Sequence, residues 1–213
     1  MREGLLQLNP GQLKSEKALM AYIHGRWGTL IGSAISNSKT RISESFLAAL
    51  IANESGGDAD AKRLEKPIFA ELIKLSQGRI PNWGSITISD IQSLSYDELM
   101  DIATSWGLTQ VMGYHTLGTG RPARDLAEPE FNIIKSISIL ESFARRWKLD
   151  SATQPEKLFS VWNTGRPNGK TYDPNYIPRG ILRMGIYEKI LAGGHLKSEI
   201  GDFRVSDPEI GLD

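Results

Sequence analysis

The stretch SESFLAALIANESGG, residues 43–57, has the pattern of a helix that ends abruptly after an acidic residue. Ser43 is a good N-cap, because its side-chain oxygen can accept a hydrogen bond from a free backbone amide of the first turn. The Gly56–Gly57 pair supplies the backbone freedom that terminates a helix. The apolar residues between these signals recur at the spacing of one helical face: Phe46, Leu47, Leu50 and Ile51. These features predict a helix over Ser43–Asn53.

Glu54 extends the apolar face of this helix by one turn. It follows Ile51 by three residues and Leu50 by four, so it lies on the same face. An apolar surrounding raises the pKa of a carboxyl, and a glutamic acid still protonated near neutral pH can donate a proton to a leaving group. The alternative is a surface glutamate at a frayed helix end, although a negative charge is unfavourable at a helix C-terminus. We expect Glu54 to line a cleft as a general acid.

The composition of the 213-residue chain limits the classes of function. Lys+Arg and Asp+Glu number 25 each and no basic stripe appears, so phosphate-driven binding of nucleic acid is not expected. The absence of cysteine rules out disulfides and thiolate metal sites. The three histidines lack the His-Glu-x-x-His spacing of a zinc hydrolase. We therefore expect neither a metal nor a cofactor.

Membrane and export signals are not apparent either. No stretch approaches the ~18 consecutive apolar residues of a membrane span. Residues 1–17, MREGLLQLNPGQLKSEK, lack the apolar run of a secretory signal. If the protein acts outside the cell that makes it, we expect another route of export or release.

The remainder of the chain is predicted to be mainly α, with a very small β element. Periodicity, capping residues and turn residues indicate further helices at 14–24, 27–35, 63–78, 96–105, 128–148, 155–162 and 176–192. The segment 84–90, GSITISD, has the alternation of one arm of a β-hairpin. We expect the helix 128–148 to be the most buried element, because it carries the longest apolar stripe: Phe131, Ile134, Ile137, Leu140, Phe143 and Trp147.

Four segments resemble, in order, motifs of the lysozyme-like superfamily that contains soluble lytic transglycosylases and goose-type lysozymes. LIANESGG (50–57) resembles the Glu-Ser core, and ATSWGLTQVMGYH (103–115) looks like the Gly-Leu-Met-Gln segment. FSVWNTG (159–165) is similar to the Tyr-Asn-Ala-Gly motif, and YIPRGILRMGIY (176–187) to a closing helix that begins with tyrosine. KPIFAEL (66–72) and SWGLTQVMGYH also resemble a phage-type N-acetylmuramidase family.

The resemblance implies a lysozyme-like catalytic domain over 41–195. Residues 1–40 would pack on it as a helical extension, and 196–213 would form a C-terminal tail. The chain departs from the transglycosylase pattern at three places: Thr109 stands for Met, Trp162 stands for Tyr, and residues 58–102 form a longer insert. These departures leave the subgroup open.

The resemblance also implies an activity and its residues. The reaction is cleavage of the β-1,4 bond between N-acetylmuramic acid and N-acetylglucosamine in peptidoglycan, with Glu54 protonating the glycosidic oxygen. The resemblance of these motifs implies five substrate-binding residues: Ser55, Gln110, Tyr114, Asn163 and Tyr176. The amides of Gln110 and Asn163 suit sugars because each carries both a donor and an acceptor. We expect a monomer that acts on glycan strands of the cell wall, in the periplasm or outside the cell.

Three choices stay open. Glu71 within KPIFAEL is a candidate second carboxylate that would face Glu54, whereas an exposed Glu71 would pair with Lys74 or Lys66. An inverting hydrolase needs a second carboxylate to activate water, but a transglycosylase lets a hydroxyl of the substrate attack. A non-catalytic wall-binding module of the same fold is the alternative to an enzyme.

Overall fold

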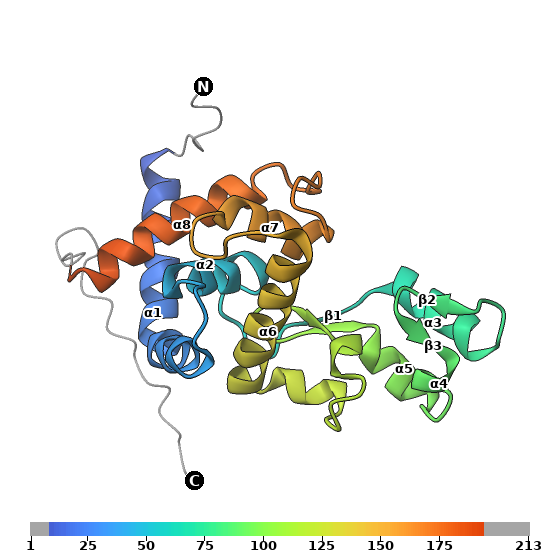
Figure 1. Cartoon of the computed structure of the whole chain (residues 1–213). Coiled ribbons are helices and arrows are strands. Elements are labelled where there is room, and N and C mark those ends of the chain that lie inside the picture. The colour runs from blue at the N-terminus through green and yellow to red at the C-terminus, as the bar shows by residue number, and fades with distance from the viewer. Residues whose placement is uncertain (1–8, 194–213) are drawn as a thin grey trace, which may run out of the picture.

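The computed structural model describes residues 9–193, and this part of the chain is mainly helical (Figure 1). The expectations for residues 1–8 and for the tail 196–213 lie outside the described residues. The α-helices are α1 (Pro10–Ser38), α2 (Glu44–Glu54), α3 (Lys66–Ser76), α4 (Ile88–Ile91), α5 (Tyr96–Ile102), α6 (Pro129–Trp147), α7 (Pro155–Thr164) and α8 (Tyr176–Leu191). The strands and 3-10 helices are β1 (Lys62–Leu64), β2 (Asn82–Trp83), β3 (Ile86–Thr87), β4 (Thr104–Trp106), β5 (Val111–Met112), η1 (Gly113–Thr116) and η2 (Ala123–Ala127).

The helix α2 lies at the centre of the larger lobe, where α1 and α8 pack against it. Ser43 caps it as predicted, since its Oγ accepts a hydrogen bond from the Phe46 amide at 3.1 Å. The predicted end is also confirmed, because Gly56 and Gly57 adopt φ values of 66° and 92°. Eight consecutive residues, 45–52, are buried, so α2 has no solvent face over most of its length.

The helix α1 is one continuous element of 29 residues, where the sequence predicted two short helices at 14–24 and 27–35. Asn9 and Gln12 form a capping box that starts it early. Its buried residues face α2 and α8, and this packing stabilises a helix whose internal signals are weak. Over residues 9–193, no helix has the combination of length and apolar character needed to cross a bilayer.

The helix α6 matches the predicted bounds within one residue, but the prediction that it is the most buried element is wrong. Ile134 is 44% exposed and Trp147 is 38% exposed. The predicted stripe advanced by three residues at a time as far as Phe143, whereas a helical turn takes 3.6, so such a series drifts around the helix. The buried face instead follows alternating steps of four and three through Ile133, Ile137, Leu140 and Ala144, with Ser136 buried beside them.

A smaller lobe consists of α3, α4, α5 and the β2–β3 hairpin, and Figure 1 shows it well apart from α2. The hairpin predicted near 84–90 is confirmed in part: Ile86–Thr87 form the strand β3, with Trp83 paired to Ile86, but Ile88–Ile91 form the helix α4. Ser95 and Glu98 form a capping box at the start of α5, so the predicted start of this helix is confirmed. The lobe has its own apolar cluster, which includes the fully buried Leu72 of α3.

A three-stranded antiparallel sheet in the order β1–β4–β5 connects the two lobes. The strands β1 and β4 pair through Lys62 with Trp106 and Leu64 with Thr104. Both occupy segments that the sequence predicted as helix ends, at 63–65 and 103–105. Three-residue strands leave no alternation to detect, and only their pairing with each other defines them.

A buried asparagine fixes α6 to the loop between β4 and β5. The Asn132 Oδ1 accepts hydrogen bonds from the backbone amide and the hydroxyl of Thr109, at 3.0 and 2.7 Å. Its Nδ2 donates to the carbonyl oxygens of Trp106 and Leu126 at 2.8 Å each. Thr109 is completely buried, and Asn132 satisfies both of its polar groups. This arrangement accommodates a threonine at a position where the transglycosylase pattern has methionine.

Candidate active site

Glu54 is the last residue of α2 and lies at the edge of the apolar core. Burial raises the pKa of its carboxyl from 4.5 to about 7. Two groups oppose this rise: a hydrogen bond from Tyr176 and, more weakly, the positive charge of Arg63 on β1. A substantial fraction of the carboxyl is therefore protonated at neutral pH, and the protonated form is the one that can act as a general acid.

Tyr176 is the first residue of α8, and its hydroxyl donates a hydrogen bond to the Glu54 Oε1. The tyrosine is only 8% exposed, and its ring lies edge-on to Phe159. Burial and the charge of Glu54 both raise the pKa of the phenol, so it stays a donor. Two residues 122 positions apart in the sequence thus meet at the end of α2.

Ser55 uses its hydroxyl within the fold. The Oγ donates to the Leu108 carbonyl oxygen at 2.7 Å and accepts a hydrogen bond from the Gly57 amide at 3.2 Å. The first bond joins the end of α2 to the loop that leads to Gln110. Ser55 therefore holds the backbone around Glu54, and the hydroxyl that was predicted to bind substrate is engaged within the fold.

Gln110 also directs its amide toward the protein. Its Nε2 donates to the carbonyl oxygens of Ala61 and Gly107 at 3.0 Å each, and its Oε1 accepts a hydrogen bond from Ser105 at 2.8 Å. These contacts hold the residue in a left-handed conformation, with φ of 54°. Only one lone pair of Oε1 is left for a ligand, so the Gln110 amide mainly stabilises the surrounding backbone.

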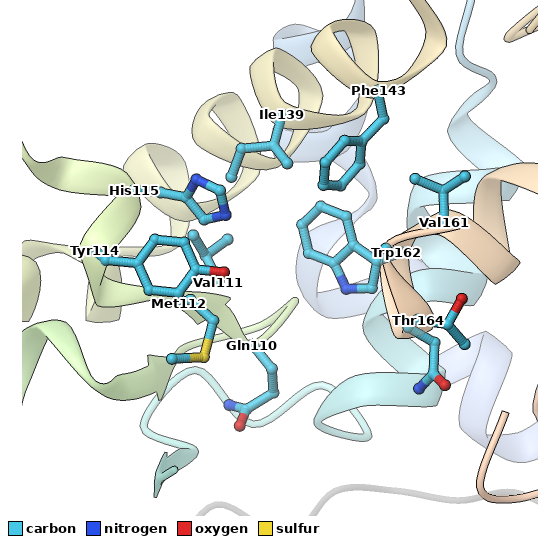
Figure 2. Close-up of a pocket in the computed structure, with 12 residues that line it drawn as sticks. Gln110, Val111, Met112, Tyr114, His115, Ile139, Phe143, Val161, Trp162 and Thr164 are labelled. Carbon is cyan, nitrogen blue, oxygen red and sulfur yellow. The ribbon is translucent and has the colours of Figure 1, made fainter. Parts of the chain in front are cut away.

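A hollow of about 340 Å³ lies between the β5–η1 segment and the helices α6 and α7. Figure 2 shows Tyr114 and His115 on one side of it and Phe143 and Trp162 on the other. Asn163 also lines the hollow; it is exposed, and its side chain forms no hydrogen bond within residues 9–193. The lining combines aromatic faces with one available amide.

The histidine in this hollow is neutral. Burial and, secondarily, the charge of Lys135 lower the pKa of His115 to about 4. A neutral imidazole offers one donor and one acceptor, so His115 can exchange hydrogen bonds with an uncharged ligand. His115 and Phe143 were not among the binding residues predicted from the sequence. Only the side-by-side placement of η1 and α6 reveals them.

The structure thus arranges the five predicted binding residues and Glu54 in two groups. Tyr176 contacts Glu54, and Ser55 is adjacent to it. Gln110, Tyr114 and Asn163 line the hollow, whose lining does not include Glu54. The bond from Ser55 to the Leu108 carbonyl connects the backbones of the two groups. A cleft lined by Glu54 itself stays a prediction.

Glu71 is not brought to Glu54. It lies on α3 in the smaller lobe, and its carboxylate forms an ion pair with Lys74 at 2.6 Å. Its side chain is 38% exposed. This geometry corresponds to the pairing alternative that the sequence left open.

No protein-family model, no curated protein and no solved structure matches the chain.

Proposed function

We propose that this protein is a peptidoglycan-cleaving glycosidase with a lysozyme-like fold, in which Glu54 is the general acid. The bond cleaved is the β-1,4 linkage between N-acetylmuramic acid and N-acetylglucosamine. The observation that carries the proposal is the state of Glu54, a carboxyl with a pKa of about 7 at the end of a buried helix. The four motifs that resemble lysozyme-like enzymes supply the reaction class.

The hydrogen bond from Tyr176 suits proton donation. Because the phenol donates to Oε1, the acidic proton resides on Oε2 and is free to move to the glycosidic oxygen. Once the proton has left, the same phenol and the Arg63 guanidinium stabilise the carboxylate that remains. Burial keeps the acid protonated before the reaction, and these two groups support the ion after it.

The hollow beside Gln110 supports binding of an uncharged, amphipathic ligand such as a sugar ring. Phe143 and Trp162 provide flat apolar surfaces, while neutral His115 and the Asn163 amide provide hydrogen bonds. Its volume of about 340 Å³ lies within the range of small-molecule sites. An acetamido group, with one donor and one acceptor, complements these two polar side chains.

Between the two reaction routes, single-acid transglycosylation has more support. Burial, Tyr176 and Arg63 account for the pKa of Glu54, and no other carboxylate in residues 9–193 contributes to it. Glu71 is paired with Lys74 in the other lobe. Attack by a hydroxyl of the substrate needs no second carboxylate, whereas inverting hydrolysis does.

The proposal is tested by digesting purified peptidoglycan and analysing the released fragments by mass spectrometry. Wild type should release muropeptides with anhydro ends, and Glu54→Gln should release none while remaining folded. Glu130→Gln, a change of the same chemistry at an exposed position of α6, should behave like wild type. Fragments with reducing ends would indicate hydrolysis instead. Binding of peptidoglycan without any release by wild type would favour the non-catalytic wall-binding module.

A further inference from the structure

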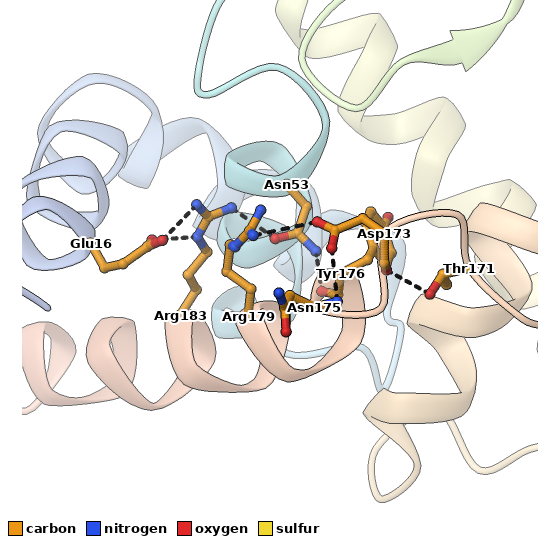
Figure 3. A network of polar contacts seen from close by, with 8 residues as sticks. All are labelled: Glu16, Asn53, Thr171, Asp173, Asn175, Tyr176, Arg179 and Arg183. Carbon is orange, nitrogen blue, oxygen red and sulfur yellow. Dashed lines mark hydrogen bonds and ion pairs between the residues drawn. The ribbon is translucent and has the colours of Figure 1, made fainter. Parts of the chain in front are cut away.

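A buried ion pair connects α1 to α8 behind the candidate active site (Figure 3). Arg183 is 7% exposed, and its guanidinium donates to both carboxylate oxygens of Glu16, from Nε at 2.6 Å and from Nη2 at 3.1 Å. A further donor, Nη1, reaches the Asn53 Oδ1 at 2.8 Å. The planar guanidinium thus donates to two partners, Glu16 and Asn53, in fixed directions.

Asn53 connects Arg183 to Tyr176. Its Nδ2 donates to the Tyr176 carbonyl oxygen at 3.0 Å, while its Oδ1 accepts from Arg183. The amide can satisfy both partners in only one orientation, because a flipped amide would set donor against donor. Asn53 also opposes, through hydrogen bonding, the rise that burial and the Glu54 charge impose on the pKa of Tyr176.

Asn53 precedes Glu54 in the chain, so the contacts form a closed circuit. It runs from Glu16 through Arg183 and Asn53 to Tyr176, whose hydroxyl donates to Glu54. Arg183 follows Tyr176 by seven residues, which places both on one face of α8, two turns apart. The end of α2 and the start of α8 are therefore held in one relative position.

Stability alone does not require such a pair. Replacing a buried ion pair by well-packed apolar residues is often neutral or stabilising, because desolvation offsets the Coulomb attraction. What apolar residues would lack here is a donor directed at Asn53. The contribution particular to Arg183 is orientation of that amide.

We propose that Glu16, Arg183 and Asn53 are positioning residues that hold the Tyr176 hydroxyl on the Glu54 carboxyl. The inference rests on the proposed function of Glu54. It makes α1 a part of the catalytic machinery, since Glu16 comes from this helix. A second contact joins α1 to the backbone that follows Glu54, because the Trp27 Nε1 donates to the Gly57 carbonyl oxygen at 3.0 Å.

The inference predicts the direction in which pH dependence changes. The groups that act on the Glu54 carboxyl are Tyr176 of α8 and Arg63 of β1, and both lower its pKa. If Tyr176 moves away, the pKa of Glu54 rises further. Because the acid must be protonated to act, the alkaline limb of the pH–rate profile then moves to higher pH.

The test variant is Asn53→Ala, which cuts the circuit and leaves the Arg183–Glu16 pair in place. The alkaline limb should move up by about 0.4 to 1 pH unit, the worth of one hydrogen bond. The kcat for peptidoglycan fragments should fall about 10-fold with little change in KM, because the hollow is untouched. Tyr176→Phe should give the same direction of shift, and the double variant should add little to it.

The matched control is Ser45→Ala, which removes another hydrogen bond between α2 and α8, the 3.0 Å contact of Ser45 with Glu188. It should lower stability without moving the pH profile. Should Asn53→Ala fail to fold, Arg183→Lys keeps a charge for Glu16 but loses the fork that reaches Asn53, and it should move the limb in the same direction.

The titration of Glu54, followed by NMR of carboxyl-labelled protein, is independent of activity. An unchanged pKa of Glu54 in Asn53→Ala, or a shift of equal size in Ser45→Ala, would overturn the positioning role. Absence of cleavage by wild type would contradict the proposed function, and an upward pKa shift in Asn53→Ala would then still support the positioning of Tyr176.

Discussion

α2 and α3 are helices of equal length, 11 residues each, and each carries a glutamate that the sequence motifs single out. α2 buries eight consecutive residues, whereas α3 buries only two. Glu54 ends α2 against the core, with a pKa of about 7 and a tyrosine hydroxyl as its partner. Glu71 lies in the middle of α3, part exposed and paired with Lys74.

The difference shows that the helix around a glutamate decides its chemistry. A carboxyl held against apolar residues loses solvation, and its neutral form becomes competitive near pH 7. A carboxyl in contact with water and an ammonium group forms a surface ion pair, which contributes little to stability. Neither motif alone distinguishes these two environments.

The largest expected effect comes from placing a charge in each helix. Ala49 of α2 is completely buried, whereas Ala70 of α3 is exposed. Ala49→Lys should prevent folding, because burying an unpaired ammonium costs several kcal/mol. Ala70→Lys should change the free energy of unfolding by less than about 0.5 kcal/mol. Circular dichroism during thermal unfolding measures both, and a folded Ala49→Lys protein with the wild-type Tm would contradict the burial of α2.

The next effect is the difference in activity between the two glutamates. Glu54→Gln should reduce kcat by about 10² to 10⁴-fold, since the general acid is lost. Glu71→Gln should leave kcat and the pH profile unchanged. The rates come from release of soluble fragments from peptidoglycan. An equal loss in Glu71→Gln would instead place Glu71 in the mechanism and support hydrolysis with two carboxylates.

A further effect concerns stability as a function of pH. The pKa of Glu54 in the folded state is about 7, against an ordinary value of 4.5 for a glutamic acid side chain. The folded state therefore binds the proton more tightly, and the resulting stabilisation is complete below pH 4.5 and is lost as the pH rises through 7. The loss is up to about 3 kcal/mol, at roughly 1.4 kcal/mol per pKa unit.

Glu54→Gln removes this dependence because it cannot ionise. Its Tm should exceed that of wild type at pH 8 and approach it at pH 4.5, as measured by scanning calorimetry. Glu71→Gln serves as the control, and its difference in Tm from wild type should not depend on pH in this way. A Glu54→Gln protein that is less stable than wild type at pH 8 would argue against a desolvated carboxyl.

The smallest effect is the ion pair on α3. Lys74→Met should lower the free energy of unfolding by about 0.2 to 1 kcal/mol, as is typical of exposed pairs. The difference should shrink in 1 M salt, where charges are screened within about 3 Å. Urea unfolding at low and high salt measures it. A larger, salt-independent loss would contradict the exposed position of the Glu71–Lys74 pair.

The candidate site was partly predictable because its signals are local. The N-cap Ser43, the terminating glycines and the apolar spacing before Glu54 all act within a few residues, and each has the predicted geometry. The resemblance of four motifs marked Tyr176, which does contact Glu54. It marked Gln110 as well, but could not indicate that its amide binds the backbone of Ala61 and Gly107.

The sequence by itself determined a mainly helical chain, most helix ends and the glutamate that follows the apolar face of α2, because periodicity and capping depend on neighbours within one or two turns. Only the tertiary structure decided which face of α6 is buried, that β1 pairs with β4, and how acidic Glu54 is. Those properties depend on partners far apart in the chain. Asn53 lies 130 residues from Arg183, and Arg183 lies 167 from Glu16, so no local pattern records that they meet.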